Sequence, residues 1–81
     1  MKTLRTNKPS PRFAVCVDNS GYEVSLELHK IYLVVPDPEA AKERDIRIVD
    51  ESGEDYLFDA KRFVRVVLPK ALERAVLRKA S

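Results

Sequence analysis

Hydrophobic and polar residues alternate most regularly on the two sides of Glu51-Ser52-Gly53, and this pattern predicts a β-hairpin. The tripeptide suits a three-residue loop, in which a type I turn is followed by a residue in the left-handed conformation. Gly53 occupies the position where a positive φ is needed, and glycine adopts it without the steric cost of a Cβ atom. We therefore expect residues 44–58 to form the central folding element of the chain.

The length of this loop determines which residues face each other across the hairpin. The predicted pairs are Asp50 with Glu54, Ile48 with Tyr56, and Ile46 with Phe58. Because side chains alternate between the two faces of a strand, the four apolar members of these pairs share one face, which we expect to build the core. A two-residue Ser52-Gly53 loop would instead place Leu57 opposite Ile48 and Phe58 on the other face. We prefer the first register, because it collects both aromatic rings on the core side.

A second β-forming run covers residues 13–17 and is closed by the turn-forming residues 18–21. Phe13, Val15 and Val17 alternate along this run. We expect their face to enter the core and the side chain of Cys16 to point to the opposite face.

Residues 22–29 also alternate, with Val24, Leu26 and Leu28 on the apolar side and His29 on the polar side. This pattern is typical of a half-buried extended segment. The β-forming run 31–35 follows without a turn residue. Two arrangements stay open: a single long strand, or an irregular arm that bends near His29-Lys30.

Prolines and acidic residues mark two short helical segments. Asp37-Pro38-Glu39 has the features of a helix start, with Asp37 as the N-cap and proline at the first position, and at most two turns are available. Residues 59–63 are predicted to form one tight helical turn. The run 64–68 then provides a final strand that ends before Pro69.

The C-terminal residues 69–79 consist mostly of strong helix formers, with proline at the start. Leu72, Ala75 and Val76 lie at helical spacing and predict a narrow apolar stripe. An isolated helix of this length is marginal in water, so we expect it to pack on its own sheet or on another chain.

Composition fits one soluble globular domain of 81 residues, of which 44% are hydrophobic and 35% charged. The net charge of +2 is unevenly distributed. Residues 1–12 carry four basic side chains and no acid, and are expected to be a flexible basic arm. Residues 13–60 hold twelve acids and four bases, whereas residues 61–79 hold seven bases and one acid. The simplest interpretation of this layout is a solvated surface, and the second is a bipolar binding surface.

A single cysteine, Cys16, excludes an intrachain disulfide and favours a reducing compartment. No apolar N-terminal run resembles a signal peptide, and no stretch approaches the length of a membrane span. We therefore expect a cytoplasmic protein without a membrane partner.

The order of these elements resembles an SH3-type small β-barrel. The strand at 13–18, the arm ending in Leu26-Glu27-Leu28-His29-Lys30 and the strand at 31–35 are similar to its opening, and residues 54–64 resemble its closing segment. The resemblance implies a mostly β fold: a five-stranded barrel over 13–68, with a one-turn helix before the last strand and a C-terminal α-helix over 69–81.

The closing segment, residues 54–64, matches the SH3 pattern at some positions and departs from it at others. The resemblance implies that Phe58 and Val64 are core residues, that Asp59 replaces a proline, and that Phe63 lies near the place of a tyrosine. The chain has no tryptophan, so proline-rich PxxP peptides are not expected ligands. Lys30-Ile31-Tyr32, together with residues 50–56, also resembles small bacterial proteins of unassigned function, which adds no activity.

Four acids at the tip of the predicted hairpin are the clearest candidates for chemistry: Asp50, Glu51, Glu54 and Asp55. Carboxylates could bind Mg²⁺ or Ca²⁺, but their spacing does not match an EF-hand loop. A charged tip also protects a sheet from edge aggregation, and we favour this role. No arrangement of serine, cysteine and histidine indicates a nucleophile with its base. We expect no metal, no cofactor and no catalytic residues.

The favoured hypothesis is a non-enzymatic module for protein–protein interaction or regulation, with an unidentified protein partner. The predicted partner-binding residues are Tyr32, Tyr56, Phe63, Arg62 and Arg65. The alternative is an RNA- or DNA-binding barrel that uses the basic closing segment for phosphates and the rings of Phe63 and Tyr32 for stacking. A third arrangement, in which the C-terminal helix holds the partner or a second copy, leaves the oligomeric state open.

Overall fold

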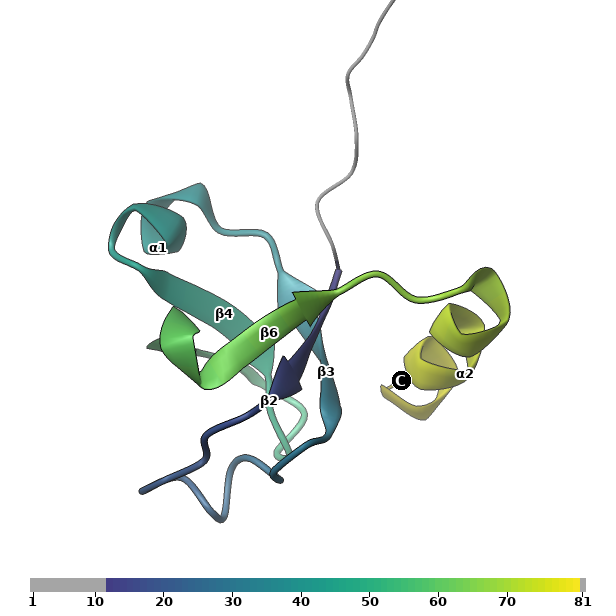
Figure 1. The fold of residues 1–81 in the computed structure, drawn as a ribbon, viewed down its shortest axis with the longest axis horizontal. Coiled ribbons are helices and arrows are strands. Elements are labelled where there is room, and N and C mark those ends of the chain that lie inside the picture. Colours follow the sequence, from purple (N-terminus) through teal and green to yellow (C-terminus); the bar gives the residue numbers. More distant parts are fainter. Residues whose placement is uncertain (1–11, 81) are drawn as a thin grey trace, which may run out of the picture.

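The computed structural model describes residues 12–80 and, within them, forms one five-stranded antiparallel sheet with two α-helices and one 3₁₀ turn (Figure 1). The elements are β2 (Phe13–Cys16), β3 (Ile31–Val35), α1 (Pro38–Lys42), β4 (Asp45–Val49), β5 (Asp55–Asp59), η1 (Ala60–Arg62), β6 (Phe63–Val66) and α2 (Lys70–Ala80). The prediction of a mostly β chain with five strands and a C-terminal helix is confirmed. The predicted basic arm lies outside the described residues, apart from Arg12.

The strands follow the order β5-β4-β3-β2-β6, so β5 and β6 form the two ends of the sheet. No hydrogen-bonded ladder joins these end strands within the described residues, so the sheet is not closed, and the expectation of a closed five-stranded barrel is wrong. The two ends instead meet through side chains. The rings of Phe58 on β5 and Phe63 on β6 lie with their centroids 6.0 Å apart.

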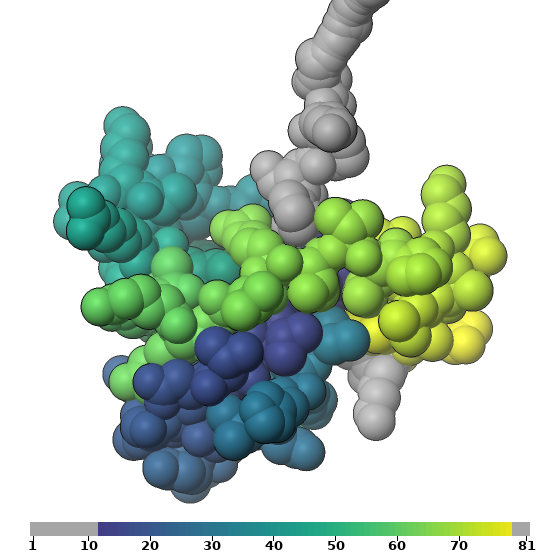
Figure 2. Space-filling view, in the orientation of Figure 1, coloured from purple at the N-terminus to yellow at the C-terminus, as the bar shows by residue number. Residues whose placement is uncertain are grey.

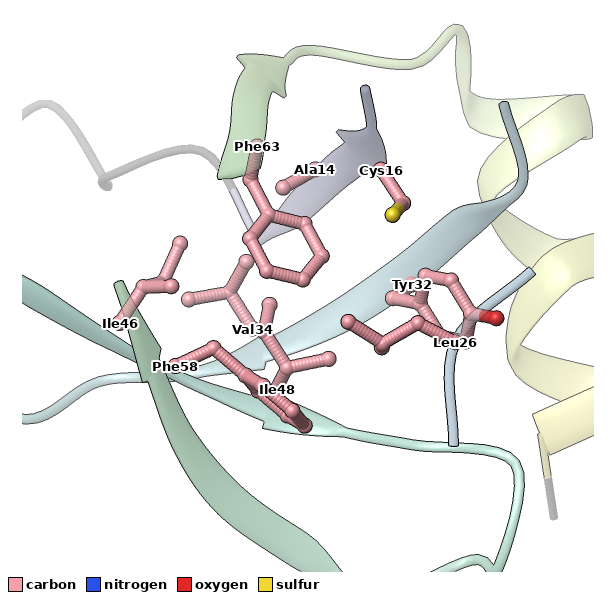
Figure 3. Packing of buried hydrophobic residues seen from close by; sticks show 9 residues of the cluster. All are labelled: Ala14, Cys16, Leu26, Tyr32, Val34, Ile46, Ile48, Phe58 and Phe63. Atoms are coloured by element: carbon pink, nitrogen blue, oxygen red, sulfur yellow. The ribbon is translucent and has the colours of Figure 1, made fainter. Parts of the chain in front are cut away.

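The hydrophobic core fills the space between β2 and β6 on one side and β4 and β5 on the other (Figure 3). β3 pairs with both β2 and β4 and so connects the two halves. Buried side chains alternate with more exposed ones along β3 and β4, as expected for strands with one core face. The core residues are Ala14, Cys16, Leu26, Tyr32, Val34, Ile46, Ile48, Phe58 and Phe63.

The predicted register of the central hairpin is confirmed. Ile46 pairs with Phe58 and Ile48 with Tyr56. Gly53 has a φ of +86°, and its amide donates a hydrogen bond of 3.0 Å to the carbonyl of Asp50. The prediction that Tyr56 joins the core is wrong, because its side chain is 48% exposed. Tyr56 lies on an edge strand near the hairpin tip, where its hydroxyl group donates a hydrogen bond to the exposed Glu54 carboxylate.

The predicted orientation of β2 is wrong. Ala14 and Cys16 face the core, and Val17 is exposed. Phe13 is also buried, but it lies on the other face, where its register neighbour on β3 is Leu33. α2 packs against β3, so part of this second face is covered as well. Alternation cannot identify the core face of a strand that is covered on both sides.

The segment between β2 and β3 is the irregular arm that the sequence left open, and it bends at His29, whose φ is +68°. Local turns replace the predicted alternation: the amide of Leu26 donates to the carbonyl of Tyr22 at 2.8 Å. Leu26 alone enters the core, with 0% exposure, whereas Val24 is 93% exposed. The expectation that Val24 and Leu28 share a buried face with Leu26 is therefore wrong.

Both short helical segments form where the sequence predicted them. The Asp37 carboxylate caps α1 by accepting a hydrogen bond of 3.0 Å from the amide of Ala40. η1 precedes β6, and β6 begins at Phe63, which pairs with the core-facing Cys16. Phe63 is consequently buried and Val64 is exposed. The core position that the SH3 resemblance implied for Val64 is wrong.

The C-terminal helix α2 packs against β3 of its own sheet. Glu73, Val76 and Leu77 are half-buried, at the spacing of one helix face. Leu72 and Ala75, which were predicted to belong to the apolar stripe, are exposed, whereas Val76 is half-buried. Figure 2 shows α1 and α2 on opposite sides of the visible face, with β6 between them.

Candidate functional site

Two of the predicted partner-binding residues, Tyr32 and Phe63, lie in the core with their rings perpendicular and 6.4 Å apart. The hydroxyl of Tyr32 accepts a hydrogen bond of 2.6 Å from the amide of Glu27 and donates one to the Glu51 carboxylate. Burial and the hydrogen bond to Glu51 raise the pKa of Tyr32 well above its usual value. Rings buried in this way cannot provide the exposed stacking platform that the sequence suggested.

Arg62, another predicted contact residue, stabilises the arm of its own chain. Its Nη1 group donates to the carbonyl oxygens of Asp18 at 3.2 Å and Ser20 at 2.9 Å. The guanidinium also lies 4.7 Å from the centroid of the Tyr22 ring. The Asp18 carboxylate is 3.5 Å away. Arg62 therefore holds the arm between β2 and β3 against η1.

The remaining two predicted residues, Tyr56 and Arg65, are exposed but belong to β5 and β6, the opposite ends of the sheet. The structure thus does not bring the five predicted residues together on one surface. Tyr56 nevertheless lines a surface depression, and the sequence had not predicted that the residues of this depression lie together.

This depression, which we call the tyrosine pocket, has a volume of about 300 Å³. Tyr22 and Tyr56 are 43% and 48% exposed, and the buried Phe58 lies with them in the lining. The rings of Tyr22 and Phe58 are perpendicular, with centroids 5.3 Å apart. The lining residues are Tyr22, Ser25, Asp50, Ser52, Tyr56, Leu57 and Phe58.

Contacts between the arm and the hairpin tip create the tyrosine pocket. The amide of Glu51 donates a hydrogen bond of 3.0 Å to the carbonyl of Ser25 and so holds the arm against the tip. The side-chain amide of Asn19 donates to the carbonyl of Leu26 at 3.0 Å and closes the arm on itself. Tyr22 is placed beside the hairpin by these two bonds. No local signal in the sequence indicated this position.

Asp50 is a buried acid in the pocket lining, with only 8% exposure. Its Oδ1 atom accepts hydrogen bonds from the amide and from the hydroxyl of Ser52. Among residues 12–80, no donor is bonded to its second oxygen, Oδ2. A buried carboxylate with an unused oxygen is a strong acceptor for an incoming donor.

The surroundings of the Tyr56 hydroxyl are negative. This hydroxyl donates to the Glu54 carboxylate at 3.2 Å. The charge of Glu54, followed by that hydrogen bond, raises the pKa of Tyr56, and the charges of Asp50 and Asp55 act in the same direction. Carboxylates near the tip therefore create a field that favours a cation at the rim of the pocket.

The four acids of the hairpin tip bond to different partners. Asp50 bonds to Ser52, Glu54 bonds to Tyr56, and Glu51 is 2.7 Å from the ammonium of Lys30. Asp55 pairs with Arg47 at 3.2 Å. In the part of the chain that the structure describes, no group of three or more histidine, cysteine or acidic side chains is arranged to hold a metal ion.

A larger and more enclosed depression, which we call the helix groove, has a volume of about 490 Å³ and is lined by β3, the hairpin tip and α2. Its apolar lining includes Ile31, Leu33 and Val76. The charges at its rim, Lys30 and Glu51, pair with each other. Asp50 lines the groove as well as the tyrosine pocket. The tyrosine pocket differs from the groove in its two half-exposed tyrosine rings, Tyr22 and Tyr56.

Cys16 is inaccessible in the core, and its burial raises the pKa of the thiol. Because the thiolate is the reactive form, this cysteine is unsuited to nucleophilic chemistry.

Family models, curated proteins and solved structures gave no match to this chain. Across residues 12–80, neither α-helix has the length and apolar character needed to span a membrane.

Proposed function

We propose that this protein is a non-enzymatic module for protein–protein interaction in the bacterial cytoplasm, and that it holds its partner at the tyrosine pocket. We further propose that its scaffold is an open variant of the SH3-like small barrel, in which the two end strands meet through side chains and not through a hydrogen-bonded ladder. The order of five strands, with a one-turn helix directly before the last one, agrees with that resemblance. The side-chain contact between the end strands, through Phe58 and Phe63, also supports it.

The observation that carries the proposal is the pair of half-exposed tyrosines around an apolar floor. Tyrosine side chains combine a large apolar ring with a polar edge and lose little conformational entropy on binding, so they are enriched at interface hot spots. Tyr22 and Tyr56 line the same depression as the buried Phe58. The domain thus presents two half-exposed tyrosine rings beside a core phenylalanine.

The chemistry of the described residues supports a binding role rather than catalysis. The only cysteine is buried. The acids of the hairpin tip are engaged by Ser52, Lys30, Tyr32, Tyr56 and Arg47. A shallow pocket at a hairpin tip is also open to water, which is a poor setting for acid–base catalysis.

Site-specific photocrosslinking in cells tests the proposal. A photoreactive phenylalanine analogue replaces Tyr56 in one variant and Val67, which is 82% exposed near α2, in the control variant. We expect a discrete protein adduct from position 56 and none from position 67.

Three outcomes would overturn this assignment. An adduct from position 67 alone would move the partner to the C-terminal helix. A nuclease-sensitive adduct would support nucleic-acid binding instead. The absence of an adduct from position 56, with the variant folded, would remove the tyrosine pocket as the contact surface.

A further inference from the structure

We infer that the tyrosine pocket receives the cationic side chain of an arginine or lysine, so that the partner presents a basic segment. This inference rests on the proposed function and specifies the chemistry of its ligand. It depends on three features of the pocket: a buried carboxylate, an excess of negative charge at the rim, and two aromatic rings.

The buried carboxylate of Asp50 provides an anchoring group. One oxygen is satisfied by Ser52, whereas Oδ2 has no hydrogen-bond donor among residues 12–80. Burying an ionised group without full hydrogen bonding is costly, and a cationic donor compensates that cost through a charge-assisted hydrogen bond. A guanidinium or ammonium group on the ligand meets this requirement, whereas an apolar side chain or a carboxylate does not.

Two arginines of neighbouring segments, Arg47 and Arg62, already lie beside other acids. Arg47 binds Asp37 at 2.9 Å and Asp55 at 3.2 Å. Arg62 lies beside the Asp18 carboxylate at 3.5 Å. Within the described residues, no salt bridge joins Asp50 or Glu54 to a basic side chain. These two carboxylates accept hydrogen bonds from Ser52 and Tyr56, but no basic side chain of the described residues neutralises their charge.

The aromatic rings favour the same ligand class. A cation within about 6 Å of the centroid of a tyrosine ring is attracted by the negative face of the ring. This chain already makes such a contact, because the Arg62 guanidinium lies 4.7 Å from the centre of the Tyr22 ring. Since Arg62 occupies that position, we assign the incoming cation to the side of Tyr56 and Asp50.

The size of the pocket agrees with one long side chain. A volume of about 300 Å³ is at the lower limit of small-molecule sites. Leu57 and Phe58 provide apolar surface for the methylene groups of arginine or lysine. The charged end of the ligand can then reach the carboxylates of Asp50 and Glu54.

A direct binding assay with the full chain tests the inference. The probes are two fluorescein-labelled peptides of alternating alanine and arginine, or alanine and citrulline, which have nearly the same shape but differ in charge. Binding is followed by fluorescence anisotropy at low and high salt. We expect the citrulline peptide to bind at least about fivefold more weakly, and arginine-peptide binding to weaken as salt rises.

Matched charge variants locate the effect. Glu54→Gln removes a carboxylate from the rim, and Glu39→Gln removes one from the exposed face of α1. We expect Glu54→Gln to weaken arginine-peptide binding by about threefold or more and Glu39→Gln to leave it unchanged. Asp50→Asn is a second test, since asparagine keeps an acceptor for Ser52.

Several results would overturn the inference. Equal affinity for the two peptides would reject a cationic ligand. If the Tyr56→Ala variant then failed to bind either peptide, the proposed function would still stand. Equal weakening by Glu54→Gln and Glu39→Gln would indicate nonspecific attraction. A self-associated form that Glu54→Gln dissociates would identify a second copy of this chain as the occupant. Failure of both peptides to bind, with the position-56 crosslink intact, would reject only the basic ligand.

Discussion

The hydroxyl of Tyr32 donates a hydrogen bond to the carboxylate of Glu51 and so ties the centre of the sheet to the tip of the hairpin. The same hydroxyl accepts a hydrogen bond from the amide of Glu27 in the arm. One buried oxygen thus joins three segments whose arrangement creates the tyrosine pocket. The importance of this junction can be measured through the stability of the domain.

Replacing Tyr32 with phenylalanine removes the hydroxyl and leaves the amide of Glu27 without its acceptor. We expect Tyr32→Phe to lower the free energy of unfolding by about 1–2 kcal/mol, as measured by urea denaturation. Tyr56→Phe is the matched control, because the Tyr56 ring is exposed, and its stability should equal that of the parent protein. Equal losses in the two variants would contradict the junction.

Stability should fall at alkaline pH, and Tyr32 should cause part of that fall. The pKa of Tyr32 is raised in the folded protein, so the neutral phenol is favoured by folding. Its contribution is fully present below the unfolded pKa of about 10 and is lost as the pH rises toward the folded pKa. The buried thiol of Cys16 acts in the same direction.

Unfolding measured between about pH 8 and pH 11 tests this expectation. The loss of stability on raising the pH should be smaller in Tyr32→Phe than in the parent protein. An identical pH dependence in both proteins would show that Tyr32 ionises as freely in the folded state as in the unfolded chain.

Two leucines in the arm test whether it packs as the structure shows. Leu26 is fully buried and Leu28 is exposed, although they have the same place in the alternation. Leu26→Ala should destabilise the protein by about 2–4 kcal/mol through the cavity it leaves, and Leu28→Ala by well under 1 kcal/mol. Thermal and urea unfolding of the two variants provide the comparison, and similar losses would contradict the irregular arm.

The turn of the central hairpin depends on Gly53, whose φ is +86°. A Cβ atom at this position would meet no other atom within 4 Å, so any cost of Gly53→Ala arises from the backbone conformation alone. We expect a loss of about 1 kcal/mol in the free energy of unfolding. Gly53→Asn should lose less, because asparagine tolerates the left-handed region. A stabilised alanine variant would argue against this turn.

The features that the sequence predicted correctly depend on contacts between residues close in the chain. The hairpin register follows from a three-residue loop and one glycine, and α1 follows from the bond between Asp37 and an amide three residues later. Such local hydrogen bonds carry their own sequence signature. Pattern reasoning therefore located these elements to within a few residues.

The features that the sequence missed depend on distant contacts. The predicted orientation of β2 was wrong because both faces of this strand are covered. Phe13 on one face is as buried as Cys16 on the other. The tyrosine pocket was missed because Tyr22 meets the hairpin through long-range contacts, namely the hydrogen bond from Glu51 to Ser25 and the packing of its ring on Phe58. Alternation within one segment contains no information about such pairings.

The central claim is that the tyrosine pocket binds a basic segment, and an NMR titration tests it most directly. The isotope-labelled full chain is titrated with the arginine–alanine peptide, and backbone amide shifts are followed. We predict that the largest shifts occur at Tyr22, Ser52, Tyr56 and Leu57, around the pocket. Largest shifts at Ile31, Leu33 and Val76 in the helix groove, or no shifts at all, would contradict the claim.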